Sequence, residues 1–242
     1  MANIVLVHGA WSGSWSWNDV TSLLRAAGHE VHAPTLTGLA ERSHIPPTQV
    51  NLSSHVADIA GLLHWNDLRD VILVGHSYGG MVITGAADRE IARIRGMIYI
   101  DAFVPQSGQS AWYMSGPERA SAQKAAAEAH DGGLSVPRGR APANSSPTDA
   151  ARFDPLFTAH PINCFNEPYL ATRAEPNLWP PRHYAVCTAY NPSPFQTIAA
   201  RLHDDKDWSV SELHAYHDVV RTHPADVVEM IEKVLASWKT TA

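Results

Sequence analysis

The stretch DVILVGHSYGG at residues 70–80 decides the fold of this chain. Residues 70–74 form a short apolar run that predicts a buried β-strand, and the glycine-rich residues after them predict a sharp turn into a helix. The pattern Gly-x-Ser-x-Gly in that setting is typical of a nucleophile elbow, in which a strained turn exposes a serine hydroxyl. Gly75 and Gly79 lie two residues either side of Ser77, where side chains would collide as the helix folds back against the strand. We therefore expect Ser77 to be a nucleophile, and the competing interpretation is a glycine-rich turn with an incidental serine.

Length and composition indicate one α/β domain. The chain has 242 residues, of which 45% are hydrophobic, so it can form a large core. Its formal net charge is −6 without a block of like charge, so we expect neither a nucleic-acid partner nor a membrane partner. The two cysteines, Cys164 and Cys187, are too few and too far apart in the sequence for a disulfide framework or a metal site. Without a signal-peptide pattern or a long apolar stretch we expect a cytoplasmic protein, and a homodimer is left open.

The first hundred residues alternate between short apolar runs and helical patterns. Such alternation indicates a mostly parallel, doubly wound sheet of about six strands, covered by helices on both faces. We expect strands at residues 3–7, 29–33, 70–74, 96–101, 183–188 and 208–213. We expect helices at residues 17–27, 56–65, 78–87, 117–130, 194–202 and 224–238, with Ser53 or Ser54 as the N-cap of the second.

The composition and the hydrophobic pattern of the sequence change in residues 104–181. This segment carries most of the 17 prolines, has short helical patterns and lacks clear strand signals. It is too long for a simple loop, so we interpret it as a helical cap insertion that covers one end of the sheet. Residues 1–103 and 182–242 then form the α/β core.

A serine hydroxyl is a weak nucleophile and needs a neighbouring base, which is most often a histidine. His217 follows the last expected strand and precedes the closing helix, so its loop reaches the carboxyl ends of the strands, where Ser77 also lies. Two other histidines compete for this role. His214 is still close to the strand, and His223 immediately precedes Pro224 at the start of the closing helix. We expect His217 to be the base.

The acid of the triad is expected between the serine and the histidine in chain order. One usual location, the loop after the penultimate strand, spans residues 187–194 and contains no carboxylate. Asp101 closes the apolar strand that follows the elbow helix, where an acidic residue is costly unless it is paired or solvated. We favour Asp101 as the acid over a role in capping the following turn. Asp204, Asp205 and Asp207, in a polar turn, are the alternatives.

The tetrahedral intermediate of acyl transfer needs two backbone N–H donors. One is expected from Tyr78, the residue after the nucleophile. The other is expected from the loop VHGAWSG at residues 7–13, where Gly9 permits a tight turn and Ala10 is the donor. We expect His8 to pack beneath this loop.

Three stretches resemble the α/β-hydrolase superfamily: VHGAW at 7–11, GHSYGGMV at 75–82 and YIDAFVP at 99–105. More narrowly, they resemble the branch of plant methylesterases, hydroxynitrile lyases and bacterial carboxylesterases, including pyrethroid-type esterases. The resemblance covers nearly the whole chain and is weakest in the cap. It implies the α/β-hydrolase fold and a Ser-His-Asp hydrolase without a cofactor or metal.

This chain departs from relatives in that branch at several positions. Plant members carry their acid after the penultimate strand, and Asp101 substitutes for it here. Relatives often have a glycine before the catalytic histidine, where this chain has Tyr216. Lyases of the branch carry threonine in the oxyanion loop and lysine after the histidine. Gly9 and Asp218 stand there in this chain, which favours hydrolysis.

These residues predict hydrolysis of a small, apolar or aromatic carboxylic ester or lactone through an acyl-enzyme. The aromatic residues of the cap are expected to supply an apolar pocket, although some of them must form the cap's own core. They are Trp112, Tyr113, Phe153, Phe157, Phe165, Tyr169 and Trp179. The alternatives are a cyanohydrin lyase, a non-catalytic ligand receptor on the same scaffold, and a cofactor-free oxygenase.

Overall fold

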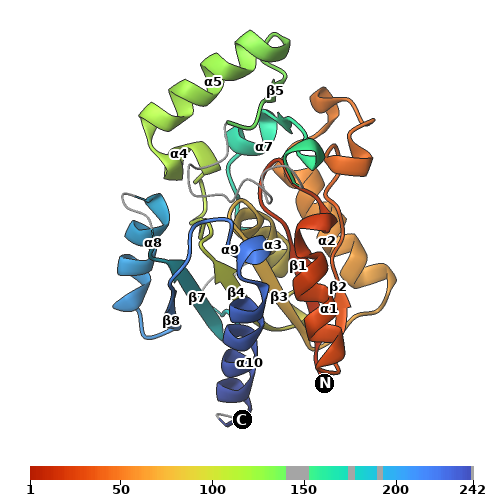
Figure 1. The fold of residues 1–242 in the computed structure, drawn as a ribbon, viewed down its shortest axis with the longest axis vertical. Helices are drawn as coiled ribbons and strands as arrows, with labels where there is room; N and C mark the ends of the chain where they lie inside the picture. Colours follow the sequence, from red (N-terminus) through yellow and green to blue (C-terminus); the bar gives the residue numbers. More distant parts are fainter. Residues whose placement is uncertain (140–152, 174–177, 190–192, 241–242) are drawn as a thin grey trace.

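A parallel sheet forms the centre of the molecule (Figure 1). The computed structural model describes residues 1–139, 153–173, 178–189 and 193–240. Within them, six strands are arranged in the order β2-β1-β3-β4-β7-β8, and every pair is parallel. The strands are β1 (Asn3–Val7), β2 (Glu30–His32), β3 (Val71–His76), β4 (Ile94–Ile100), β7 (Arg182–Cys187) and β8 (Trp208–Leu213). The sequence expectation of a mostly parallel sheet of about six strands is confirmed.

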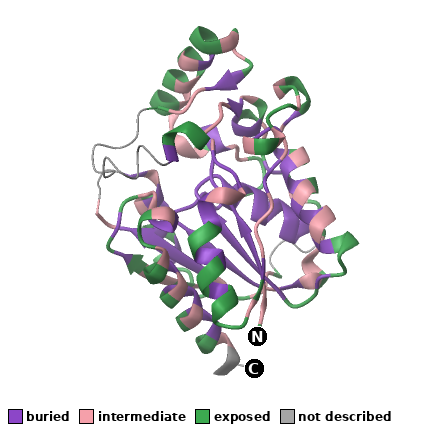
Figure 2. Cartoon of the chain, turned by 45° about the vertical axis from the view of Figure 1, so that its right-hand side comes forward, coloured by how far each residue is buried: buried purple, intermediate pink, exposed green. Residues whose placement is uncertain are grey.

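Side chains of each central strand alternate between two cores, because successive residues of a strand point to opposite faces. In β1, Val5 and Val7 lie in one core, and Ile4 and Leu6 lie in the other. Figure 2 shows the strands buried throughout the middle of the molecule. Burial of each such aliphatic side chain contributes about 1.5–3 kcal/mol. The near-continuous apolar strands of the sequence are thus explained by a sheet that is covered on both sides.

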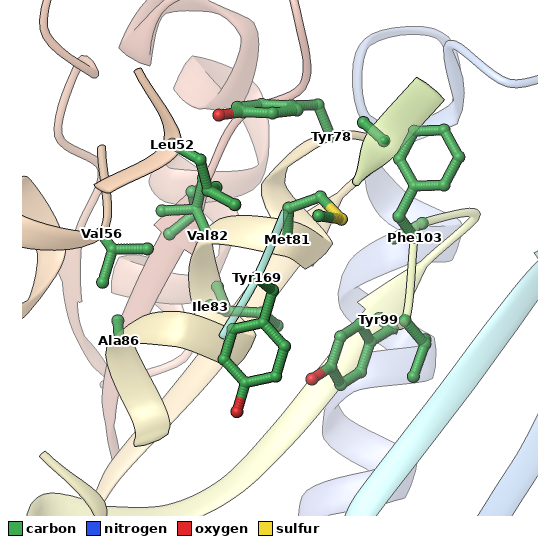
Figure 3. Close-up of a cluster of buried hydrophobic side chains, with 14 of the residues drawn as sticks. Leu52, Val56, Tyr78, Met81, Val82, Ile83, Ala86, Tyr99, Phe103 and Tyr169 are labelled. Atoms are coloured by element: carbon green, nitrogen blue, oxygen red, sulfur yellow. The ribbon is translucent and has the colours of Figure 1, made fainter. Parts of the chain in front are cut away.

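Helices cover both faces of the sheet. Side chains of α2 (Leu52–Trp65), α3 (Gly79–Arg89) and α8 (Pro194–His203) belong to the first core. Side chains of α1 (Asn18–Ala26), α9 (Val219–Thr222) and α10 (Pro224–Thr240) belong to the second. In Figure 3, Val82 and Ile83 of α3 lie between Val56 of α2 and Tyr99 of β4. The helix after the elbow is therefore fixed from both sides.

The start of α2 differs from the expectation. The helix begins at Leu52, and its N-cap is Asn51 rather than Ser53 or Ser54. The Asn51 side chain accepts from the Ser54 N–H at 2.9 Å, and the Ser54 hydroxyl accepts from the Asn51 N–H at 2.9 Å. This capping box satisfies two backbone donors at once, which explains why the helix starts earlier.

The described elements between β4 and β7 lie above the carboxyl ends of the strands (Figure 1). Its elements are α4 (Ala111–Ser115), α5 (Pro117–Asp131), β5 (Ser135–Val136), β6 (His160–Pro161) and α7 (Asn163–Asn166). β5 and β6 pair antiparallel and form a small second sheet, which the sequence did not predict. Strands of two residues are too short to produce an alternating pattern.

Five short 3₁₀ helices complete the described part of the chain. They are η1 (Ser14–Trp17), η2 (Ala40–Arg42), η3 (Pro47–Gln49), η4 (Ile91–Arg93) and η5 (Asp154–Leu156). No helix in the described ranges is long and apolar enough to cross a membrane.

Candidate active site

Ser77 lies at the turn between β3 and α3. Its φ of 56° is in the left-handed region, which is uncommon for a residue other than glycine. A Cβ on Gly79 would lie 2.5 Å from the carbonyl oxygen of Val7, and a Cβ on Gly75 would lie 2.8 Å from that of Gly79. The turn is held in place by a 3.2 Å hydrogen bond from the Ser77 N–H to the carbonyl of Ile100. The two glycines are thus required by the close approach of backbone, as the sequence pattern indicated.

The structure brings Ser77, His217 and Asp101 together. Nε2 of His217 lies 2.9 Å from Oγ of Ser77, and Nδ1 lies 2.6 Å from Oδ2 of Asp101. Because a carboxylate only accepts, Nδ1–H donates to Asp101, and Nε2 accepts from the serine hydroxyl. Asp101 is fully buried, and its other oxygen accepts from the N–H of Cys187 at 3.1 Å.

The other residues weighed from the sequence form no hydrogen bond with Ser77 in the described part of the chain, and His214 lines a separate cavity with Ser209 and Ser211. The turn with Asp204, Asp205 and Asp207 precedes β8, at the amino end of the sheet, whereas Ser77 lies at the carboxyl end. Nδ1 of His223 bonds the Thr222 hydroxyl at 2.9 Å.

Two aromatic rings enclose the imidazole of His217. The Phe195 ring stacks on it with centroids 4.9 Å apart and planes at 3°, and the His76 ring lies 4.8 Å away. Nε2–H of His76 donates to the carbonyl of His217 at 2.7 Å. Burial, together with repulsion from His217 when that ring is protonated, lowers the pKa of His76 to about 3, so the His76 ring stays neutral. The sequence analysis missed both neighbours. His76 adjoins the serine and could have been found there, but no sequence signal pointed to Phe195.

Two backbone amides beside Ser77 are available to a ligand. In the described structure the N–H groups of Ala10 and Tyr78 have no protein acceptor. The next amide, that of Trp11, is already used, because it donates to Nδ1 of His160 at 3.2 Å. Ala10 thus has the free donor that the sequence analysis expected of this loop.

His8 lies beneath the loop, as expected. It is fully buried, and its Nδ1–H donates to the carbonyl of Gly9 at 2.8 Å. Its Nε2 accepts from the N–H of Leu36 at 3.0 Å. His8 therefore supports the loop from within the core and does not face the serine.

A cavity of about 370 Å³ opens beside Ser77 and His217. Small apolar residues of α5 and β5 and the chain after them form much of its wall: Ala122, Ala126, Val136 and Pro137. Of the seven cap aromatics expected to line a pocket, only Phe157 does so in the described part of the wall. Trp112, Phe153, Phe165 and Tyr169 are buried, and Phe153 and Phe165 pack against the core residues Trp15 and Trp11. Tyr113 is exposed, and Tyr169 and Trp179 line a separate cavity. The described wall therefore takes one aromatic ring from the cap, and most of the other expected rings pack against protein.

Charged side chains form another part of the wall. Asp218 forms an ion pair with Arg221, and Arg138 lies 3.8 Å from the same carboxylate. Burial opposes ionisation of Asp218, but Arg221 and His217 outweigh it and hold the pKa of Asp218 below its ordinary value. The guanidinium of Arg138 also lies over the Phe157 ring, 3.4 Å from its centroid. The cavity therefore combines a small aliphatic wall with fixed charges, which sequence reasoning did not anticipate.

Comparison with known proteins identifies the family. A model of the alpha/beta hydrolase family matches residues 4–230. The chain belongs to the α/β-hydrolase family. A carbendazim hydrolyzing esterase of Nocardioides sp. strain SG-4G is 38% identical over 250 residues, which cover 96% of this chain and 98% of that protein. This α/β-hydrolase is accordingly an esterase-type hydrolase, as its motifs predicted.

Two further proteins match part of the chain or its fold. An alpha-hydroxynitrile lyase of Arabidopsis thaliana is 36% identical over 110 residues, or 43% of this chain and 41% of that protein. The solved structure of an extracellular α/β-hydrolase from a Paenibacillus species has a TM-score of 0.85 at 24% identity, over 96% of this chain and 98% of its own. The similarity to the Paenibacillus structure shows a shared fold.

Proposed function

We propose that Ser77, His217 and Asp101 are a catalytic triad that hydrolyses a small carboxylic ester through an acyl-enzyme. The observation that carries this proposal is the position of His217, with one ring nitrogen 2.9 Å from the Ser77 hydroxyl and the other 2.6 Å from the Asp101 carboxylate. A base oriented by a buried acid and bonded to a serine at an elbow is the arrangement that acyl transfer needs. The family membership and the near-full-length esterase relative support the same reaction.

The reaction follows from this geometry. Oγ of Ser77 attacks the ester carbonyl carbon while its proton passes to Nε2 of His217. The oxyanion of the tetrahedral intermediate accepts from the amides of Ala10 and Tyr78. The imidazolium, stabilised by Asp101, then gives its proton to the leaving alcohol, and the acyl-enzyme remains. Water attacks the acyl group with His217 again as base, which releases the acid and restores the serine.

The cavity favours a substrate of moderate size. About 370 Å³ suits a compact aromatic or aliphatic ester, and the small side chains Ala122 and Ala126 leave room for a flat group. The relative named for carbendazim hydrolysis adds carbamate esters to the classes worth testing, since carbendazim is itself a methyl carbamate.

The same proposal assigns residues 104–181 to the cap and residues 1–103 and 182–242 to the catalytic core. Val136 in β5 and Phe157 come from the proposed cap and line the cavity, which supports the division. The mechanism uses side chains and backbone amides only, so it requires no cofactor or metal. Both cysteines are free and buried, which fits the reducing cytoplasm as its compartment.

A lyase reaction on cyanohydrins fits this site less well. Gly9 has no hydroxyl to offer a substrate, and the residue after His217 is Asp218, whose carboxylate is paired with Arg221. The chain therefore lacks an ammonium group at the position where lyases of this branch carry lysine. We propose hydrolysis as the function.

The test is an assay of p-nitrophenyl acetate, p-nitrophenyl butyrate and carbendazim, with mandelonitrile as the lyase substrate. We expect turnover of at least one ester and no cyanide release. Ser77→Ala should lower kcat by at least about 10³-fold, because the nucleophile is lost. Ser43→Ala, at an exposed serine, is the matched control and should keep full activity. Failure of the wild type on all esters, or an active Ser77→Ala, would overturn the proposal.

A further inference from the structure

Trp11, in the oxyanion loop, is bound by three hydrogen bonds to the segment above it. Its N–H donates to Nδ1 of His160 at 3.2 Å. Its carbonyl accepts from the N–H of Thr158 at 3.0 Å, and its indole Nε1–H donates to the carbonyl of Val136 at 2.8 Å. His160 and Val136 lie on β6 and β5, which pair with each other. Trp11 thus connects the catalytic core to both strands of the small cap sheet.

These bonds hold a backbone conformation that is otherwise disfavoured. Trp11 has a φ of 65°, which a bulky residue rarely adopts. Such a conformation persists only where surrounding contacts fix it. The bond to His160 fixes the peptide plane that joins Ala10 to Trp11, and thereby the place of Ala10, whose own N–H is free.

The other amide donor is anchored in a similar way. The phenol of Tyr78 donates to Nδ1 of His55 at 3.1 Å, and Nε2–H of His55 donates to the carbonyl of Thr37 at 2.7 Å. The rings of His55 and His160 lie 5.7 Å apart, and both residues are fully buried. Burial lowers the pKa of His55 to about 4 and that of His160 well below its ordinary value. Both rings therefore stay neutral, and each keeps a nitrogen that accepts a hydrogen bond.

We propose that Trp11 and His160 are positioning residues that complete the oxyanion hole only when the β5–β6 sheet is docked on the core. This inference rests on the proposed esterase function and adds a link between cap and catalysis. Val136, which holds the indole, also lines the cavity beside Ser77. A substrate group that packs against β5 therefore stabilises the docked position of the sheet that fixes Ala10. We expect esters that fill the cavity to have a higher kcat than esters that leave it empty.

The test compares two substitutions of His160 that differ in one property. His160→Leu keeps an apolar volume but removes the acceptor. His160→Asn places an amide oxygen near the position of Nδ1 and keeps the acceptor. Trp11→Phe keeps an aromatic ring and the backbone bonds, and removes the indole donor to Val136 together with part of the ring volume. Trp65→Phe, at a tryptophan that is 85% exposed, is the matched control.

The measurements are kcat and KM for p-nitrophenyl butyrate and the inhibition constant of an aryl trifluoromethyl ketone, whose adduct with serine carries an oxyanion. We expect His160→Leu to lower kcat by about 10- to 100-fold with KM within about twofold, because an oxyanion-hole donor is displaced. His160→Asn should recover most of that loss, and Trp11→Phe should lower kcat by about tenfold. Binding of the ketone should weaken by the same factor by which kcat/KM falls, since its serine adduct resembles the transition state.

Equal loss in His160→Leu and His160→Asn, or a loss confined to KM, would overturn the inference. If circular dichroism shows that His160→Leu is unfolded, Trp11→Phe becomes the decisive variant. A wild-type kcat in Trp11→Phe would then refute the proposed positioning role. Failure of the esterase function itself is distinguishable, because the wild type would then hydrolyse none of the esters. Active wild type, inactive Ser77→Ala and fully active Trp11→Phe would refute the inference alone.

Discussion

The carboxylate of Asp101 and the imidazole of His217 are joined by a 2.6 Å hydrogen bond between residues 116 positions apart. Asp101 directly follows β4, which lies between β3, the strand that leads to Ser77, and β7. The N–H of Cys187, at the end of β7, donates to the other oxygen of the same carboxylate. The ends of neighbouring parallel strands therefore meet at one point, so an acid after β4 can reach His217 without a carboxylate after β7.

Replacement of that acid tests its role. Asp101→Asn preserves the volume but presents an amide that can donate to Nδ1 of His217, which favours the wrong tautomer. We expect kcat for p-nitrophenyl butyrate to fall by about 10⁴-fold at neutral pH. Asp205→Asn, in the polar turn at the other end of the sheet, is the control and should retain activity. Full activity of Asp101→Asn together with loss of activity in Asp205→Asn would show that the acid of the triad lies in that turn.

The ring stacked on His217 should affect catalysis by holding the imidazole in place. Phe195→Leu removes the aromatic face that lies 4.9 Å from the imidazole, so the plane of the base is less well fixed. We expect kcat for p-nitrophenyl butyrate to fall by about tenfold, because a misplaced base is less effective. Leu202→Ala weakens the packing of α8 as well and serves as the control. Unchanged kcat in Phe195→Leu, or an equal loss in the control, would contradict a positioning role of Phe195.

Two glycine substitutions should change stability in opposite directions. A Cβ on Gly80 would lie 2.1 Å from the carbonyl oxygen of Phe103, so Gly80→Ala must displace the backbone after Asp101. We expect the free energy of unfolding to fall by about 3 kcal/mol, with loss of activity. Gly61→Ala, inside α2, meets no atom closer than 3.8 Å and should raise that free energy by about 0.5–1 kcal/mol. Urea denaturation measures the free energy of unfolding of both variants. A stable and active Gly80→Ala would contradict this prediction, because it would show that the elbow accommodates a methyl group.

Acid should destabilise the fold through its buried histidines. Burial lowers the pKa of His8, His55 and His183 from the ordinary histidine value of 6.5 to about 4. Between those values the unfolded chain binds more protons than the folded one, so the free energy of unfolding falls as the pH falls from 6.5 to about 4. Each histidine contributes up to about 1.4 kcal/mol per pH unit to this slope.

His183 offers a way to measure this effect away from the active site. Its two ring nitrogens bond the hydroxyls of Ser209 and Ser211 at 2.7 and 2.8 Å. His183→Gln should lower the slope of the free energy of unfolding against pH between about pH 6.5 and about pH 4, by the equivalent of up to one bound proton. A free energy of unfolding that stays constant across this range in the wild type would refute the account.

Much of the candidate site follows from local sequence, because each of its parts depends on short-range geometry. The elbow needs small residues at fixed distances from Ser77, and the turn after β1 needs Gly9 next to the free amide of Ala10. His217 follows from chain order and the position of the last strand. Asp101 could be inferred only because the loop after β7 has no carboxylate. These expectations depend on strand ends that all parallel sheets bring to the same edge.

The sequence by itself thus determined the parallel sheet, the serine elbow and the order of the triad, since periodicity and glycine spacing act over a few residues. Only the tertiary structure decided what surrounds them. Trp11 and His160 meet across 149 positions, and Phe195 reaches His217 from a helix without any motif. The cavity wall likewise depends on which cap side chains pack against one another and which are left facing Ser77. Packing selects among many apolar partners by shape, and a linear pattern of apolar residues does not specify that choice.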